Sequence, residues 1–177
     1  CIDTVNIIGG ELNMGRDRQI PEFTFLDPRG VGKWDMLNRA DSLPAVWAMD
    51  ADEAGPYGRE ALPPPNEDGT PHETLADQSV RLRQLVSGLE SQSSGDTVLL
   101  IFPDGTGPAL LSVMIAGIPY NRVHELEFAP GEVRLDVTYE STLALWKSKQ
   151  NDPAYAAVLE QGREKLTELR SNTDIVS

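Results

Sequence analysis

Cysteine, histidine and long apolar runs are all scarce in this chain of 177 residues. Cys1 is the only cysteine, so no disulfide can form within the chain, and the two histidines lie far apart with no metal-ligand spacing. No apolar run reaches the roughly 18 residues that a membrane-spanning helix needs. The sequence therefore predicts no metal, no cofactor and no transmembrane segment.

Basic residues are also few. Lysine and arginine number 15 against 28 acidic residues, which gives a formal net charge of -13. A surface of this sign repels phosphate backbones and anionic membranes, and no basic cluster is present to offset it. The sequence predicts that nucleic acid is not a partner.

The length and the hydrophobic content of 40% suit one compact domain, residues 1–177. Apolar spacing predicts helices, and short apolar or alternating runs predict strands. The helices are expected at 1–12, 71–92, 108–117 and, interrupted near Asp152 and Pro153, 140–170. The strands are expected at 19–26, 97–102 and 132–139.

Two further regions stand out. Residues 36–69 hold many of the 13 prolines and are predicted to form a long irregular loop with short helical turns at most. Residues 140–177 are predicted to form a C-terminal helical extension. Alternation of helices and strands indicates an α/β layered domain in which a first strand, expected before residue 1, is missing.

Five blocks, in collinear order over residues 1 to about 138, resemble the histidine phosphatase superfamily, the clan of the phosphoglycerate mutases. The blocks are "IDTVNIIGGEL", "FLDPRGVGKWD", "PHETLADQSVRL", "TVLLIFPDGTGPALLSVMIAGIP" and "LEFAPGEVRLDV". The resemblance implies a three-layer α/β/α sandwich around a mostly parallel sheet, with its N-terminal strand missing from this chain.

The same resemblance implies that the phosphate pocket is lost. The family uses a nucleophilic histidine, two arginines and a second histidine around one phosphoryl group. Aligned without gaps, the family's second-histidine motif falls on Phe102, Pro103 and Asp104, so Pro103 replaces that histidine, or Asp104 replaces it if the alignment shifts by one residue. The nucleophile and its arginine would precede Cys1. No catalytic residue is therefore expected in this chain.

Four residues remain as candidates for a relic ligand-binding pocket: Arg29, Glu73, Asp104 and Gly105. Each also has a structural interpretation. Glu73 suits the start of a helix, Arg29 suits an ion pair with a nearby acid, and Asp104 suits a cap before a helix. His72 and His124 are expected to be ordinary, partly exposed histidines, and the three tryptophans are expected in the core or an interface.

The resulting functional hypothesis is a catalytically inactive pseudo-phosphatase that acts as a binding or assembly subunit. A protein partner, or a complementary N-terminal fragment, would cover the sheet edge that the missing strand leaves open. The alternative is a phosphomonoesterase or mutase whose catalytic segment lies upstream of this chain. The start at a residue other than methionine favours a processed organellar protein, and a plastid location is the preferred expectation.

Overall fold

A computed structural model describes residues 1–22, 24–93, 95–150 and 152–174, and in these residues all regular structure is helical. The only β-type pairing in the described chain is an isolated antiparallel bridge between Val31 and His72. The α-helices are α1 (Ile2–Glu11), α2 (Arg39–Glu53), α3 (Leu75–Gln92), α4 (Thr106–Ala116), α5 (Tyr139–Lys149) and α6 (Pro153–Asp174). Short 3₁₀ helices are η1 (Arg16–Arg18), η2 (Gly32–Trp34) and η3 (Tyr120–Leu126).

Side-chain caps explain where several helices begin. At α3, Thr74 accepts a hydrogen bond from the amide of Asp77 while the Asp77 carboxylate accepts one from the amide of Thr74, a reciprocal capping box. The α4 helix ends at Gly117, which adopts the left-handed conformation at φ 63° that glycine accepts at least cost.

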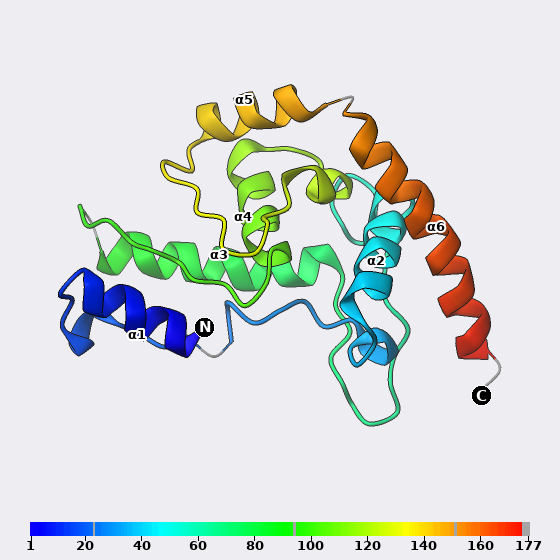
Figure 1. The fold of residues 1–177 in the computed structure, drawn as a ribbon, viewed down its shortest axis with the longest axis horizontal. Helices are drawn as coiled ribbons and strands as arrows, with labels where there is room; N and C mark the ends of the chain where they lie inside the picture. Colours follow the sequence, from blue (N-terminus) through cyan, green and yellow to red (C-terminus); the bar gives the residue numbers. More distant parts are fainter. Residues whose placement is uncertain (23, 94, 151, 175–177) are drawn as a thin grey trace.

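The apolar helix α4 lies at the centre of the molecule, and α3, α5 and η3 pack against it (Figure 1). Leu110 and Val113 of α4 and Leu126 of η3 are completely buried. Trp34 and Trp47 are also buried, in agreement with the expectation that the tryptophans lie in the core or an interface. The core therefore forms around one helix and does not lie between the faces of a sheet.

Helix α6 lies along α2 (Figure 1), and the two are held by close packing and by ion pairs. Gly162 of α6 sits against the carbonyl of Pro44, where an added Cβ would lie 2.2 Å from the carbonyl oxygen. Arg163 and Arg170 pair with Asp52 and Glu53 of α2, with shortest distances of 2.7 Å in each pair. The absence of a side chain at Gly162 lets the two helices approach this closely.

The predicted three-layer α/β/α sandwich is wrong, because the described residues form no strand and no sheet. Residues 19–22, 24–26, 97–102 and 132–138 are irregular or extended chain without a ladder, residue 139 begins α5, and residue 23 lies outside the described residues. An apolar or alternating run favours an extended backbone, but a strand exists only where a second segment pairs with it in register. The local sequence pattern indicates an extended backbone, but it does not show whether a second segment is available to pair with it.

The helix predictions are mostly confirmed. Those at 1–12, 71–92, 108–117 and 140–170 correspond to α1, α3, α4 and the pair α5 and α6. The prediction of an irregular loop over 36–69 is wrong for residues 39–53, which form α2. The many prolines of 36–69 favoured a loop prediction, although Asn38 caps the start of this helix by accepting a hydrogen bond from the amide of Ala40. In the described residues, none of the helices is both long and apolar enough to span a bilayer.

Candidate interaction surface

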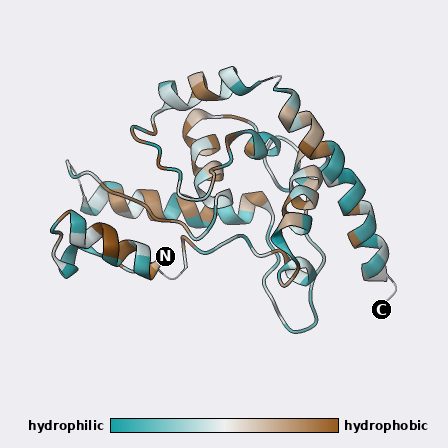
Figure 2. Cartoon of the chain, viewed as in Figure 1, coloured by the Kyte–Doolittle hydropathy of each residue, from teal (hydrophilic) through white to brown (hydrophobic). Residues whose placement is uncertain are grey.

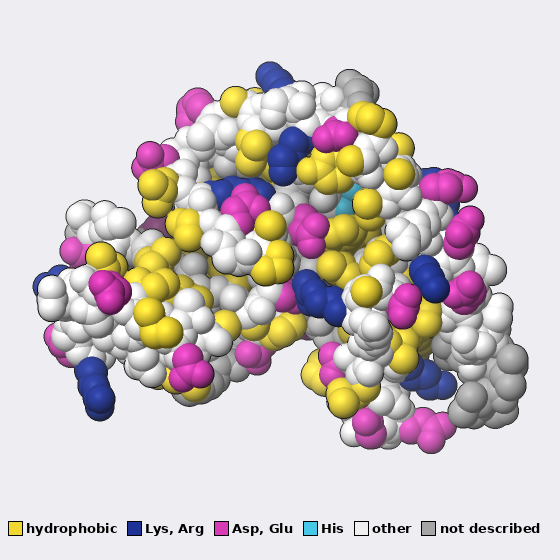
Figure 3. Space-filling model, viewed as in Figure 1, with side chains coloured by type: hydrophobic (Ala, Val, Ile, Leu, Met, Phe, Trp, Pro, Cys, Tyr) yellow, Lys and Arg dark blue, Asp and Glu magenta, His cyan; other side chains and the backbone are white. Residues whose placement is uncertain are grey.

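Residues 97–103, here called the open strip, run as extended chain across the molecule without a backbone partner. In the described part of the chain, no hydrogen bond joins the backbone of these seven residues to another residue. Val98 and Leu99 are 44% and 51% exposed. Figure 2 shows the strip as an apolar line, and Figure 3 shows hydrophobic side chains gathered on this face. Exposed apolar side chains beside unpaired backbone groups are features of an unfilled binding edge.

The carboxyl end of the open strip is fixed to the start of α4. Oδ1 of Asp104 accepts hydrogen bonds from the amide of Thr106 at 3.0 Å and from the amide of Gly107 at 3.4 Å. Its Oδ2 pairs with Nη1 of Arg39 at 3.2 Å. Asp104, which precedes the N-cap Gly105, therefore satisfies free amides at the start of α4, as its structural interpretation predicted.

A second irregular segment, residues 127–137, contains a turn at Pro130 and Gly131 and passes close to the start of α4 at Gly105. A Cβ on Gly105 would lie 2.3 Å from the carbonyl oxygen of Phe128, so only glycine permits this approach. The guanidinium of Arg134 covers the Phe128 ring, 3.6 Å from its centroid. Val133 and Leu135 of this segment are also exposed.

Acidic groups stand at both ends of the open strip. Asp96 precedes it, and Asp104 and Glu127 lie near its carboxyl end. Burial raises the pKa of the Glu127 carboxyl above its ordinary value, while Arg39 opposes that rise. A cationic group brought next to Glu127 would favour its charged form. Asp96 at one end and Glu127 at the other therefore suit a partner with basic residues, whereas Asp104 is already paired with Arg39.

Arg29 is buried and joins three segments of the chain. Its Nη1 donates to Oδ2 of Asp50 at 2.6 Å, and its Nε donates to the carbonyl of Glu73 at 2.7 Å. A third, longer hydrogen bond reaches the carbonyl of Ala61. Burial raises the pKa of the Asp50 carboxyl, and the adjacent Arg29 opposes the rise. The expectation that Arg29 pairs with an acid is thus confirmed.

Glu73 is held by Arg81 and not by the helix start. Its two carboxylate oxygens accept from Nε and Nη2 of Arg81 at 2.9 and 2.8 Å, and Oε2 also accepts from the amide of Gly30. The same guanidinium donates to the carbonyl of Thr24 at 2.7 Å and, over longer distances, to three more carbonyls up to residue 28. Glu73 and Arg81 together tie the 24–30 segment to α3.

The structure thus places the four predicted site residues in two groups. Arg29 and Glu73 contact each other, while Asp104 and Gly105 lie at the start of α4. A ligand contact for any of them stays a prediction. Sequence analysis missed Asp50 and Arg81, the side chains that occupy Arg29 and Glu73. Their patterns gave no signal, because each is one polar residue in a helix and its partner is distant in sequence.

The two histidines differ in environment. His72 is exposed, whereas His124 is buried at 3% exposure, so the prediction that both are partly exposed is wrong for His124. Burial lowers the pKa of His124 to about 4. Among the residues that the structure describes, no group of three or more His, Cys, Asp or Glu side chains could hold a metal ion.

Comparisons of this chain with protein-family models, with curated proteins and with solved structures found no match. The resemblance to the histidine phosphatase superfamily therefore has no support beyond the five sequence blocks, and its α/β fold is contradicted. Nothing supports a plastid location.

Proposed function

We propose that this chain is a binding or assembly subunit that accepts an extended segment of another protein along the open strip. The observation that carries this proposal is that the backbone groups of residues 97–103 are unpaired in the described chain while the apolar side chains of Val98 and Leu99 are exposed. The chain needs no chemistry of its own for this role.

Backbone geometry determines the form of the partner segment. An extended chain with free amide and carbonyl groups is best satisfied by a second extended chain, which adds main-chain hydrogen bonds along its length. Successive side chains of the strip point to opposite faces, so Val98 and Leu99 would both contact the added chain, one on each face. Apolar, β-branched partner residues would fill both contacts.

Charge determines the ends of the partner segment. The chain carries a net charge of -13, and the strip is bounded by Asp96 at one end and by Asp104 and Glu127 at the other. Lysine or arginine at both ends of the partner segment would be attracted over the screened range of about 8 Å at physiological salt. The proposed partner is therefore an extended apolar segment with basic ends.

A model peptide of this chemistry tests the proposal. Lys-Thr-Val-Thr-Val-Thr-Lys is expected to bind the intact chain and to slow hydrogen exchange at the amides of 98–102, which should be unprotected in the free chain. The same peptide methylated at alternate backbone nitrogens keeps its side chains and charges but loses donors. It should bind at least about tenfold more weakly, because each lost hydrogen bond costs about 1 kcal/mol.

A pair of matched variants locates the peptide. Leu99→Pro removes one amide donor from the strip, whereas Leu135→Pro makes the same change at an exposed leucine of the segment 127–137. The first should weaken peptide binding and reduce the protection of 98–102, and the second should leave both unchanged. Equal binding of the methylated peptide, or protection elsewhere with none in the strip, would refute the proposal.

The geometry gives no support to phosphoester chemistry at the predicted site. A helix start rich in glycine, such as 105–107, can bind a phosphate through its free amides. Here the carboxylate of Asp104 already accepts from two of those amides. Arg29 is committed to Asp50 and to backbone carbonyls, and Glu73 is committed to Arg81. A phosphate would meet a negative charge where it needs donors.

We therefore expect the purified chain to leave an aryl phosphate unhydrolysed. Turnover would be followed at neutral pH against a buffer blank. The Glu73→Gln variant serves as the reference, because the resemblance to the histidine phosphatases aligns Glu73 with a general acid of that family, which hydrolysis at the predicted site would require. Hydrolysis above the blank that disappears in Glu73→Gln would contradict the prediction.

A further inference from the structure

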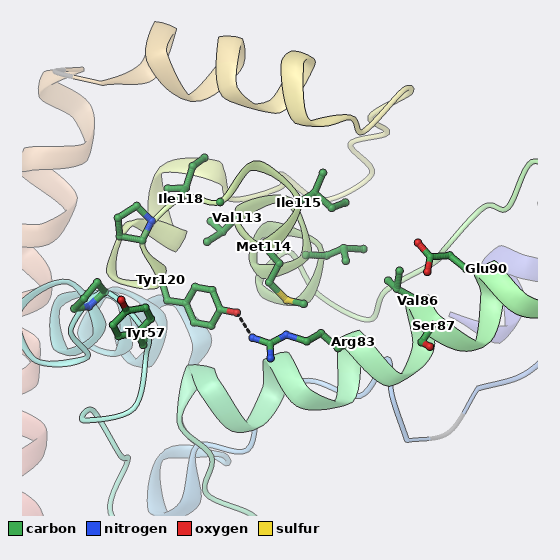
Figure 4. A pocket seen from close by; sticks show the side chains of 14 residues that line it. Tyr57, Arg83, Val86, Ser87, Glu90, Val113, Met114, Ile115, Ile118 and Tyr120 are labelled. Atoms are coloured by element: carbon green, nitrogen blue, oxygen red, sulfur yellow. Dashed lines mark hydrogen bonds between the residues drawn. The ribbon is translucent and has the colours of Figure 1, made fainter.

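A groove of about 630 Å³ lies between α3 and α4, on surface that the open strip does not use. Figure 4 shows Val86 of α3 and Met114 of α4 along it, with Tyr57 and Tyr120 at one end. Leu111, Ile118 and two prolines complete the mostly apolar lining. Its volume is that of a site for a ligand or for a row of side chains, within the usual range of about 300–1,000 Å³.

The apolar composition of α4 indicates that a binding partner covers the groove. This helix, "TGPALLSVMIA", has no charged residue, and a helix that is apolar all round belongs in a core. Leu110 and Val113 are in the core, but Leu111 and Met114 are only half-buried and Ile115 is 36% exposed at the groove. A further helix laid between α3 and α4 would bury this remaining face.

Two opposite charges mark the α3 side of the groove. Arg83 and Glu90 are seven residues apart, so they lie on one face of α3, about 10.5 Å apart along its axis. Nη2 of Arg83 donates to the hydroxyl of Tyr120 at 2.9 Å, which leaves its other donors available (Figure 4). In the described chain Glu90 has neither a hydrogen bond nor an ion pair.

Helix α5 carries the complementary pattern on its outer face. Glu140 and Lys147 are also seven residues apart, both are exposed, and within the described residues neither has a side-chain partner. Thr142, which is buried, marks the opposite, inward face. Ala144 lies between the two charges on the outer face and allows a close approach.

We infer that α5 of one copy of this chain docks into the α3–α4 groove of a second copy, parallel to α3. This direction places Glu140 against Arg83 and Lys147 against Glu90, whereas the reverse direction would oppose like charges at both ends. Each copy contains both the groove and the docking helix, so the contact is one of self-association. It is independent of the proposed partner segment at the open strip.

Charge reversal tests the inference by analytical ultracentrifugation of the intact chain at about 0.15 M salt, which screens the mutual repulsion of two acidic copies. Arg83→Glu and Glu140→Arg should each weaken self-association about tenfold, because each replaces an exposed ion pair by a like-charge pair. The double variant, with both charges exchanged, should associate as the parent chain does. A mixture of the two single variants should also regain association, because every groove then meets a helix of matching charge.

Matched controls separate this contact from the effect of net charge. Arg59→Glu and Glu164→Arg make the same charge changes at exposed positions outside the groove and α5, and they should leave association near the parent value. A chain that stays monomeric at about 0.5 mM would overturn the inference, since this excludes any but the weakest contact. So would single variants that behave like the controls, or a double variant that does not recover. Self-association abolished by Leu99→Lys and untouched by Arg83→Glu would belong to the open strip and would also overturn it.

Discussion

Asp50→Ala is expected to lower the free energy of unfolding by about 3–5 kcal/mol, because it leaves the buried guanidinium of Arg29 without its counter-charge. Arg29 and Asp50 are 6% and 1% exposed, so water cannot replace the lost partner. Domains of this size have a total stability of about 5–15 kcal/mol. Urea unfolding followed by circular dichroism at neutral pH would measure the loss.

A neighbouring carboxylate on the same helix supplies the control. Asp52 pairs with Arg163 at the surface, with side-chain exposures of 42% and 45%. Asp52→Ala should therefore cost at most about 1 kcal/mol. The double variant Arg29→Met, Asp50→Leu should recover much of the loss, since it removes both charges. Losses of similar size in Asp50→Ala and Asp52→Ala would contradict the assignment of Arg29 and Asp50 as a buried pair, as would a double variant less stable than Asp50→Ala.

Sequence pattern located most helices of this fold because their signals are local. The stripe of 71–92, the cap at Thr74 and the terminal Gly117 each act within a few residues. The strands failed for the opposite reason. The run 97–102 has the composition of a buried strand, but a strand also requires a paired neighbour, and the described chain provides none. The same composition without that neighbour produces the open strip on which the proposed function rests.

The predicted site residues show the same difference between local contacts, which the sequence indicates, and long-range contacts, which it does not. The helix-capping interpretation of Asp104 needed only the next three residues and proved right. Glu73 was placed near a helix start correctly, but its actual partner, Arg81, lies two turns further along α3 and ties down a segment around residue 25. Such a contact depends on the tertiary arrangement, which the local sequence does not specify. The sequence also shows no sign of the groove, because the pattern predicts α3 and α4 separately and does not show how the two helices pack against each other.

His124 is a buried histidine whose lowered pKa makes the stability of the chain depend on pH. It lies on η3 between α2 and α6, edge-on to the ring of Tyr155, with 6.4 Å between ring centroids. Its Nδ1 has no hydrogen-bond partner among the described residues. Burial is the main cause that lowers the pKa of His124 to about 4, and Arg122 adds to it, while Glu125 and Asp52 oppose it.

This shift predicts that the chain loses stability as the pH falls from about 6.5 towards 4. In that window the unfolded chain protonates His124 and the folded chain does not, so acid favours unfolding. With a folded pKa of about 4 and an ordinary value of 6.5, the loss amounts to about 2 kcal/mol between pH 7 and pH 5.

His124→Gln keeps a polar side chain of similar size but cannot titrate, so its unfolding free energy should fall by about 2 kcal/mol less than that of the parent chain over this range. The exposed His72→Gln variant should retain the full pH dependence of the parent chain. Urea unfolding at pH 7, 6 and 5 checks the prediction, and parallel curves for the parent and His124→Gln would show that His124 does not couple protonation to folding.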